Sequence, residues 1–168
     1  MPQRRAHRSF VSYIDKSREY YAAHGYRQPY QWPYHHEVPF TPLTKPLSEC
    51  TVGMVTTAFY PKGQEPPGVP TTPPKQPYAA PADPIPESLY TQDVAWDKEA
   101  THTDDLDTHL PLKRLSEFAK VGKLGANSRR FYGAPTTYSQ RQTCETDAPA
   151  ILNWCQEDGV DVALLVPL

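Results

Sequence analysis

Two groups of charged side chains in this sequence could bind a small ionic substrate. An imidazole and three carboxylates gather in His102-Thr103-Asp104-Asp105-Leu106-Asp107, and we take His102 and Asp107 as candidates for holding a substrate amine. Arg129 and Arg130 could hold a substrate carboxylate through paired hydrogen bonds. The alternative for both groups is structural, because acidic residues before a helix often serve only solvent or the helix dipole, and surface arginines usually stay solvated.

The other reactive side chains give no pattern for a metal or a cofactor. His35-His36-Glu37 could ligate a metal, but adjacent side chains diverge and no second ligand pair stands at helical spacing. Cys50, Cys144 and Cys155 form no C-x-x-C pair and no even disulfide set, so we expect buried, reduced thiols. Nucleotide-loop, nucleophile-elbow and zinc-protease motifs do not occur. We therefore expect no metal and no bound cofactor.

Three segments have the hydrophobic pattern of core elements. Residues 51–57 are short, β-branched and apolar, as in a buried strand. From Leu112 an apolar stripe predicts a helix that ends near Gly122. A second helix, with Thr146 as N-cap, should end at Gly159 and lead into the apolar run 160–166, which is typical of a parallel strand covered on both faces.

The rest of the chain is less regular. Apolar spacing predicts a helix over residues 9–23, and repeated prolines predict a loop over 24–46. Residues 61–86 contain ten prolines and few aliphatic residues, so we expect a surface or disordered loop there. A short strand is predicted over residues 129–132.

The order helix, glycine, apolar strand predicts an α/β fold, here an incomplete parallel-sheet domain with long proline-rich loops. The 168 residues fit one domain, and 38% hydrophobic residues suffice for a core. A net charge of -2 gives no basic surface for nucleic acid, and no apolar run is long enough to span a membrane. We expect a cytoplasmic protein that binds neither nucleic acid nor membrane.

Three segments resemble, in the same order, the selenoprotein B family of glycine, betaine, sarcosine and D-proline reductases. They are Val52-Gly53-Met54-Val55-Thr56-Thr57-Ala58, the helix Pro111-Leu112-Lys113-Arg114-Leu115 with its turn Gly122-Lys123-Leu124-Gly125, and Asp158-Gly159-Val160-Asp161 followed by Leu164-Leu165-Val166-Pro167. Phe59 and Tyr60 depart from the glycine that usually continues the first segment. The resemblance spans most of the chain.

The resemblance implies a dithiol-dependent reductase that cleaves a carbon-heteroatom bond of a small substrate. In that family a selenocysteine or cysteine commonly follows the last strand, so the catalytic residue is expected directly after Leu168 and none is expected within the chain. The codon for selenocysteine otherwise means stop, and we expect a reading frame cut at that codon. The family also tends to have His and Asp in the region of His102 and Asp107, which agrees with a substrate-amine site there.

Two alternatives stay open for a chain that stops at this strand. It could be a short subunit whose partner supplies the remaining α/β half, or a degenerate paralogue without catalysis. Reductase partner subunits or further copies of the chain are the partners expected from these alternatives.

Overall fold

The computed structural model describes residues 18–26, 36–70, 73–91, 102–137 and 139–168. The chain divides into two compact units, Met1–Phe40 and Thr41–Leu168. In the first unit residues 18–23 are helical, as predicted, whereas residues 9–17 of the predicted helix lie outside the described part. Within the described ranges no helix has the length and apolar character needed to cross a bilayer.

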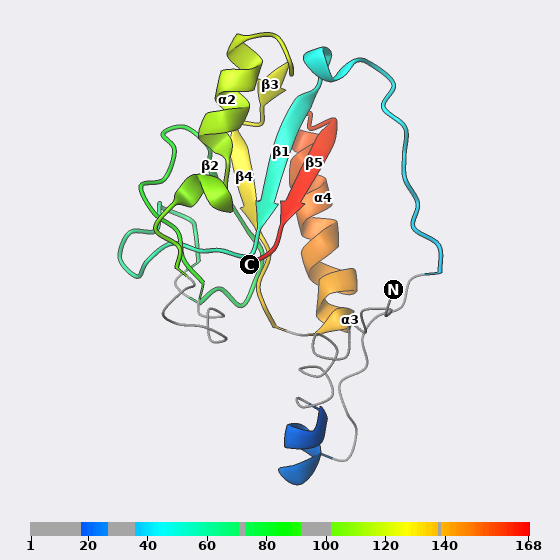
Figure 1. Ribbon diagram of the computed structural model, residues 1–168, viewed down its shortest axis with the longest axis vertical. Coiled ribbons are helices and arrows are strands. Elements are labelled where there is room, and N and C mark those ends of the chain that lie inside the picture. Colours follow the sequence, from blue (N-terminus) through cyan, green and yellow to red (C-terminus); the bar gives the residue numbers. More distant parts are fainter. Residues whose placement is uncertain (1–17, 27–35, 71–72, 92–101, 138) are drawn as a thin grey trace, which may run out of the picture. The chain divides into compact units, whose positions relative to one another are not determined.

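The second unit has an α/β fold built on a mixed, mostly parallel sheet (Figure 1). Its strands are β1 (Thr51–Thr56), β2 (Tyr78–Pro81), β3 (Ala126–Asn127), β4 (Arg130–Gly133) and β5 (Val162–Val166). β1 is central and pairs in parallel with β3 and β4 along one edge and with β5 along the other. β2 pairs antiparallel with β4 and forms the far edge. The predicted strands at 51–57, 129–132 and 160–166 are confirmed.

The helices agree with the predictions except where one of them begins. α2 (Leu112–Lys120) follows a short 3-10 turn, η2 (Leu106–Thr108), and the predicted helix is confirmed. The second predicted helix is α4 (Ala148–Glu157), but helical backbone starts earlier, in α3 (Gln140–Gln142) and the π-helical turn η3 (Thr143–Asp147). The prediction of Thr146 as N-cap is wrong, because the Ser139 side chain accepts a hydrogen bond from the Gln142 N–H and caps this helical stretch.

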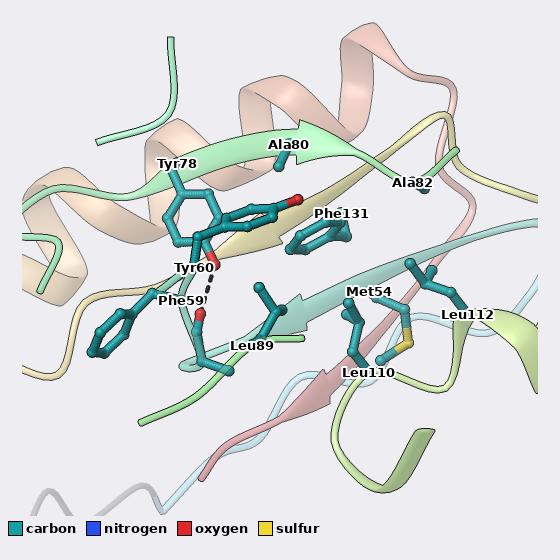
Figure 2. Packing of buried hydrophobic residues seen from close by; sticks show 11 residues of the cluster. Met54, Phe59, Tyr60, Tyr78, Ala80, Ala82, Leu89, Leu110, Leu112 and Phe131 are labelled. Atoms are coloured by element: carbon teal, nitrogen blue, oxygen red, sulfur yellow. Dashed lines mark hydrogen bonds between the residues drawn. The ribbon is translucent and has the colours of Figure 1, made fainter. Parts of the chain in front are cut away.

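The two faces of the sheet are packed differently. On one face Met54 and Phe131 are buried with Leu110 and Leu112, which precede and begin α2 (Figure 2). On the other face Gly53 lies against the Val160 and Tyr132 side chains. A Cβ on Gly53 would stand 3.0 Å from Val160 Cγ1, so a larger residue would push the segment just before β5 away from β1.

Part of the proline-rich segment belongs to the core, which corrects the prediction of a loop over residues 61–86. Tyr78 and Ala80 of β2 and the following Ala82 are buried in the main hydrophobic cluster (Figure 2). Proline is tolerated here because β2 is an edge strand, where a missing N–H donor need not break a ladder. One aromatic ring and two methyl groups thus supply the apolar surface that aliphatic residues do not.

β5 is parallel, as predicted, but it is less covered than its apolar sequence suggested. Ala163, Leu164 and Leu165 are exposed, with Leu165 68% accessible. Among the described strands only β1 pairs with it. The expectation that helices cover both faces of this strand is therefore not met by the described part of the chain.

Candidate functional site

The carboxyl ends of three parallel strands meet at one edge of the sheet. Thr56 at the end of β1 is in register with Gly133 at the end of β4 and with Val166 at the end of β5. In open α/β sheets ligands bind beyond this edge, because the loops that leave the strands converge there. Thr56, Thr57 and Ala58 leave β1 at this point, and we call them the Thr-Thr-Ala turn.

Thr57 connects the Thr-Thr-Ala turn to Leu168, which lies two residues after the end of β5. Its hydroxyl oxygen accepts a hydrogen bond from the Leu168 N–H at 2.8 Å and donates to the Leu168 carbonyl oxygen at 3.3 Å. A single side chain therefore satisfies both backbone groups of a residue 111 positions away in sequence.

Thr56 and Ala58 join the same turn to the other strands. The Thr56 hydroxyl accepts from the Ala58 N–H at 3.2 Å, which shapes the turn locally. The Thr56 carbonyl accepts from the Ala134 N–H at 2.8 Å, just after β4, and the Ala58 carbonyl accepts from the Tyr78 hydroxyl of β2 at 2.6 Å. The Thr-Thr-Ala turn is thus bonded to segments at the ends of β2, β4 and β5.

Buried aromatic side chains surround this turn. Burial raises the pKa of Tyr60 to about 12 and raises that of Tyr78 further, so both hydroxyls stay protonated at neutral pH. The Tyr78 ring lies where a Cβ on Gly133 would be, so a glycine is needed at the end of β4. The hydroxyl groups here can donate hydrogen bonds but carry no charge.

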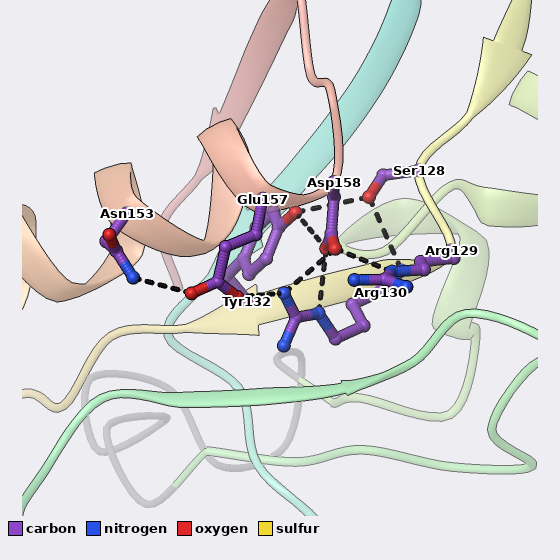
Figure 3. Close-up of polar contacts among 7 residues, drawn as sticks. All are labelled: Ser128, Arg129, Arg130, Tyr132, Asn153, Glu157 and Asp158. Carbon is purple, nitrogen blue, oxygen red and sulfur yellow. Dashed lines mark hydrogen bonds and ion pairs between the residues drawn. The ribbon is translucent and has the colours of Figure 1, made fainter.

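Arg129 and Arg130 lie at the other end of the parallel strands, where β4 begins. Both bind Asp158 (Figure 3). Arg129 Nε is 2.6 Å from Asp158 Oδ1, and Arg130 Nε is 2.8 Å from Oδ2. The Tyr132 hydroxyl donates to Oδ2 at 2.7 Å, and Arg130 also pairs with Glu157 at 2.9 Å. An internal carboxylate therefore already takes the paired hydrogen bonds that a substrate carboxylate would need.

The ionisation of Asp158 reflects this network. Burial alone would raise the pKa of its carboxyl, but hydrogen bonds from Arg130, Tyr132 and Arg129 outweigh burial and hold the pKa at about 2. The same contact raises the pKa of Arg130 above its usual value. The ion pairs and hydrogen bonds of Asp158 connect the α4–β5 turn with β4. Substrate binding by Arg129 and Arg130 stays a prediction.

His102 and Asp107 each contact a different neighbour. His102 Nδ1 is 3.5 Å from Asp104 Oδ2, and both side chains are largely exposed. Asp107 accepts from Arg114 Nε of α2 at 3.0 Å. The described contacts bring neither residue to the arginine pair, and their role in holding a substrate amine stays a prediction.

A buried histidine beside this segment was not singled out from the sequence. His109 is 1% exposed, and its Nε2 has no hydrogen-bond partner within the described part of the chain. Burial lowers its pKa, although Asp105 acts in the opposite direction. No motif marks His109, because its burial depends on how η2 and the start of α2 fold over the sheet.

The cysteines and possible metal ligands complete the set of reactive groups. Cys50 and Cys155 are buried free thiols, as predicted, whereas Cys144 is exposed, because it lies in the π-helical turn rather than on a core face. His35 lies outside the described residues. Within the described ranges no three His, Cys, Asp or Glu side chains come together as possible ligands of a metal ion.

Comparisons with known proteins add no relative to this description. No family model, no curated protein and no solved structure matches the chain.

Proposed function

We propose that this chain is the N-terminal part of an oxidoreductase component resembling selenoprotein B of glycine, betaine, sarcosine and D-proline reductases. The observation that supports the proposal is that the first and last segments of the resemblance lie side by side in the sheet. The first contains β1, and the last contains β5, which pairs with β1 at every position from Val52↔Val162 to Thr56↔Val166.

The middle segment completes this arrangement. It comprises α2 and the turn that leads to β3, which pairs in parallel with β1 at Thr51 and Val52. The last residue of this segment, Gly125, donates to the Cys50 carbonyl directly before β1, so the middle segment ends beside the first.

The proposed chemistry is the reductive cleavage of a carbon-heteroatom bond. A selenolate or thiolate directly after Leu168 would be the nucleophile, because the ionised form of such a group is the one that attacks carbon. For an amine substrate the carbon–nitrogen bond breaks, a carbon–hydrogen bond forms and the amine leaves protonated. A dithiol supplies two electrons and two protons and becomes a disulfide.

Residues 1–168 supply the frame and, on this proposal, part of the substrate site. His102 and Asp107 would hold the amine of a small-molecule substrate, with no catalytic residue within the chain itself. Arg129 and Arg130 would hold its carboxylate only in place of Asp158, their present partner where β4 begins. The natural partners would be other reductase subunits or further copies of this chain, in the cytoplasm.

The nucleotide sequence after the Leu168 codon tests this proposal directly. An in-frame UGA followed by a continuing frame with cysteine codons is the expected result, and an ordinary stop with no coding sequence beyond it would refute the reductase. The 168-residue chain should reduce no amine with dithiothreitol, because the nucleophile is absent. Dithiol-dependent turnover that is lost in Cys144→Ser would show that the redox centre lies elsewhere.

A second candidate function is favoured by the open edge of β5. A strand with exposed Leu164 and Leu165, paired with β1 alone among the described strands, could seat a strand of a complementary α/β subunit. The chain would then be a noncatalytic partner. Co-purification of a protein that binds wild type but not Leu164→Lys would favour this function, provided that the gene has an ordinary stop after Leu168.

A further inference from the structure

We infer that Thr57 is a positioning residue, whose hydroxyl fixes the backbone directly before the redox residue. This inference rests on the proposed function, which places that residue after Leu168. Two hydrogen bonds between the Thr57 hydroxyl and the Leu168 backbone support it.

The geometry gives Thr57 this role rather than its neighbour. The Thr56 hydroxyl is committed to the Ala58 N–H within the turn and is 1% exposed. The Thr57 hydroxyl instead reaches across to Leu168, at 2.8 Å to its nitrogen and 3.3 Å to its carbonyl oxygen. Of the two adjacent threonines, one shapes the turn and the other holds the end of the neighbouring strand.

Holding both backbone groups of one residue restricts the direction in which the chain continues. The regular ladder with β1 ends at Thr56↔Val166, and Pro167 has no N–H with which to extend it. The Thr57 hydroxyl therefore takes over where the ladder stops. A nucleophile on the next residue would then leave the sheet in one orientation, which lowers the entropy cost of reaching the reacting carbon.

The first experiment measures the contact itself, in the 168-residue chain, by amide hydrogen exchange at Leu168. Thr57→Val keeps the shape and removes the hydroxyl, and we expect exchange at Leu168 to become about fivefold faster, as for the loss of one hydrogen bond. Thr57→Ser keeps the hydroxyl and should exchange like wild type. Equal exchange in wild type and Thr57→Val would overturn the inference, whatever the function of the protein.

The second experiment measures positioning, in the chain read past Leu168 with cysteine at the next codon. Thr57→Val should lower kcat for dithiol-dependent reduction on the order of tenfold or more, with KM little changed. It should also shift the pH profile of alkylation of that cysteine, and Thr57→Ser should restore both. Unchanged kcat and pH profile would overturn the positioning role.

The two experiments separate this inference from the proposed function. If the extended wild-type chain has no reductase activity while Leu168 exchange responds to Thr57→Val, the reductase proposal fails and the hydrogen-bonded contact stands. The positioning role then falls with the reductase. If the extended chain is active and its turnover is unchanged in Thr57→Val, the reductase proposal stands and the positioning role of Thr57 fails.

Discussion

Replacing Asp158 with asparagine should remove the main charged tie in the second unit. The Asp158 side chain is fully buried, and it stands at the C-cap of α4, where the helix dipole disfavours a negative charge. Its ionised form is therefore stable only because Arg129, Arg130 and Tyr132 donate to it. Asparagine keeps the shape and one acceptor oxygen but loses the charge.

The size and the pH dependence of this loss of stability follow from the difference between the folded and the free pKa of the Asp158 carboxyl. The carboxyl has a pKa of about 2 in the folded chain against 3.8 when free, and at about 1.36 kcal/mol per pH unit the gap is worth about 2 kcal/mol. Because the folded pKa is the lower one, this stability is present above pH 3.8 and is lost as the pH falls toward 2. The Arg130 guanidinium left without this partner adds to the cost, so Asp158→Asn should lose about 3 kcal/mol at pH 7.

Urea unfolding followed by circular dichroism, at pH 7 and at steps down to pH 2.5, measures this difference. The gap between wild type and Asp158→Asn should be largest at neutral pH and should narrow below pH 4. Asp104→Asn is the matched control, because Asp104 is 89% exposed and should change stability by less than about 0.5 kcal/mol. A gap that is absent at pH 7, or that does not change with pH, would refute the assignment of Asp158 as a structural tie.

Three further predictions test other parts of the fold. Gly133→Ala should lower the free energy of unfolding by about 2 kcal/mol or more, because its methyl group would overlap the Tyr78 ring, whereas Gly122→Ala, at an open position with φ +72°, should cost about 1 kcal/mol. His109 has a lowered pKa, so its contribution to stability should fall as the pH drops below about 6.5, and His109→Gln should remove that dependence in melts from pH 8 to 5. Leu165→Lys should reduce the binding of a hydrophobic dye with little change in stability, and unchanged dye binding would show that β5 is not the exposed apolar surface.

The elements predicted correctly are those whose pattern is local and strong. β1 and β5 are apolar runs bounded by polar or glycine residues, and α2 has an apolar stripe at helical spacing. β2 was missed because its neighbours are prolines, and its burial depends on pairing with β4 about 50 residues later. The start of the helical stretch at Ser139 was not predicted, because Thr146 is also a good N-cap residue and no sequence pattern marks a π-helical turn.

The contacts of the candidate sites could not be predicted, because they join distant parts of the chain. Arg130 and Asp158 are 28 residues apart, and nothing in either sequence segment indicates that the two side chains meet. The hydrogen bonds of the Thr-Thr-Ala turn to β2, β4 and Leu168 could not be predicted either, because they also join distant segments. The hydrogen bond from Leu168 to Thr57 crosses nearly the whole second unit in sequence.

Polar contacts at both ends of β5 add to its parallel ladder with β1. With three central side chains exposed, the strand gains less from apolar burial than a covered strand would. Just before the strand, Asp161 accepts from the Thr51 N–H at 2.8 Å and pairs with Lys45 at 2.8 Å. Just after it, Thr57 holds Leu168, so residues near both ends of β1 fix β5 in register.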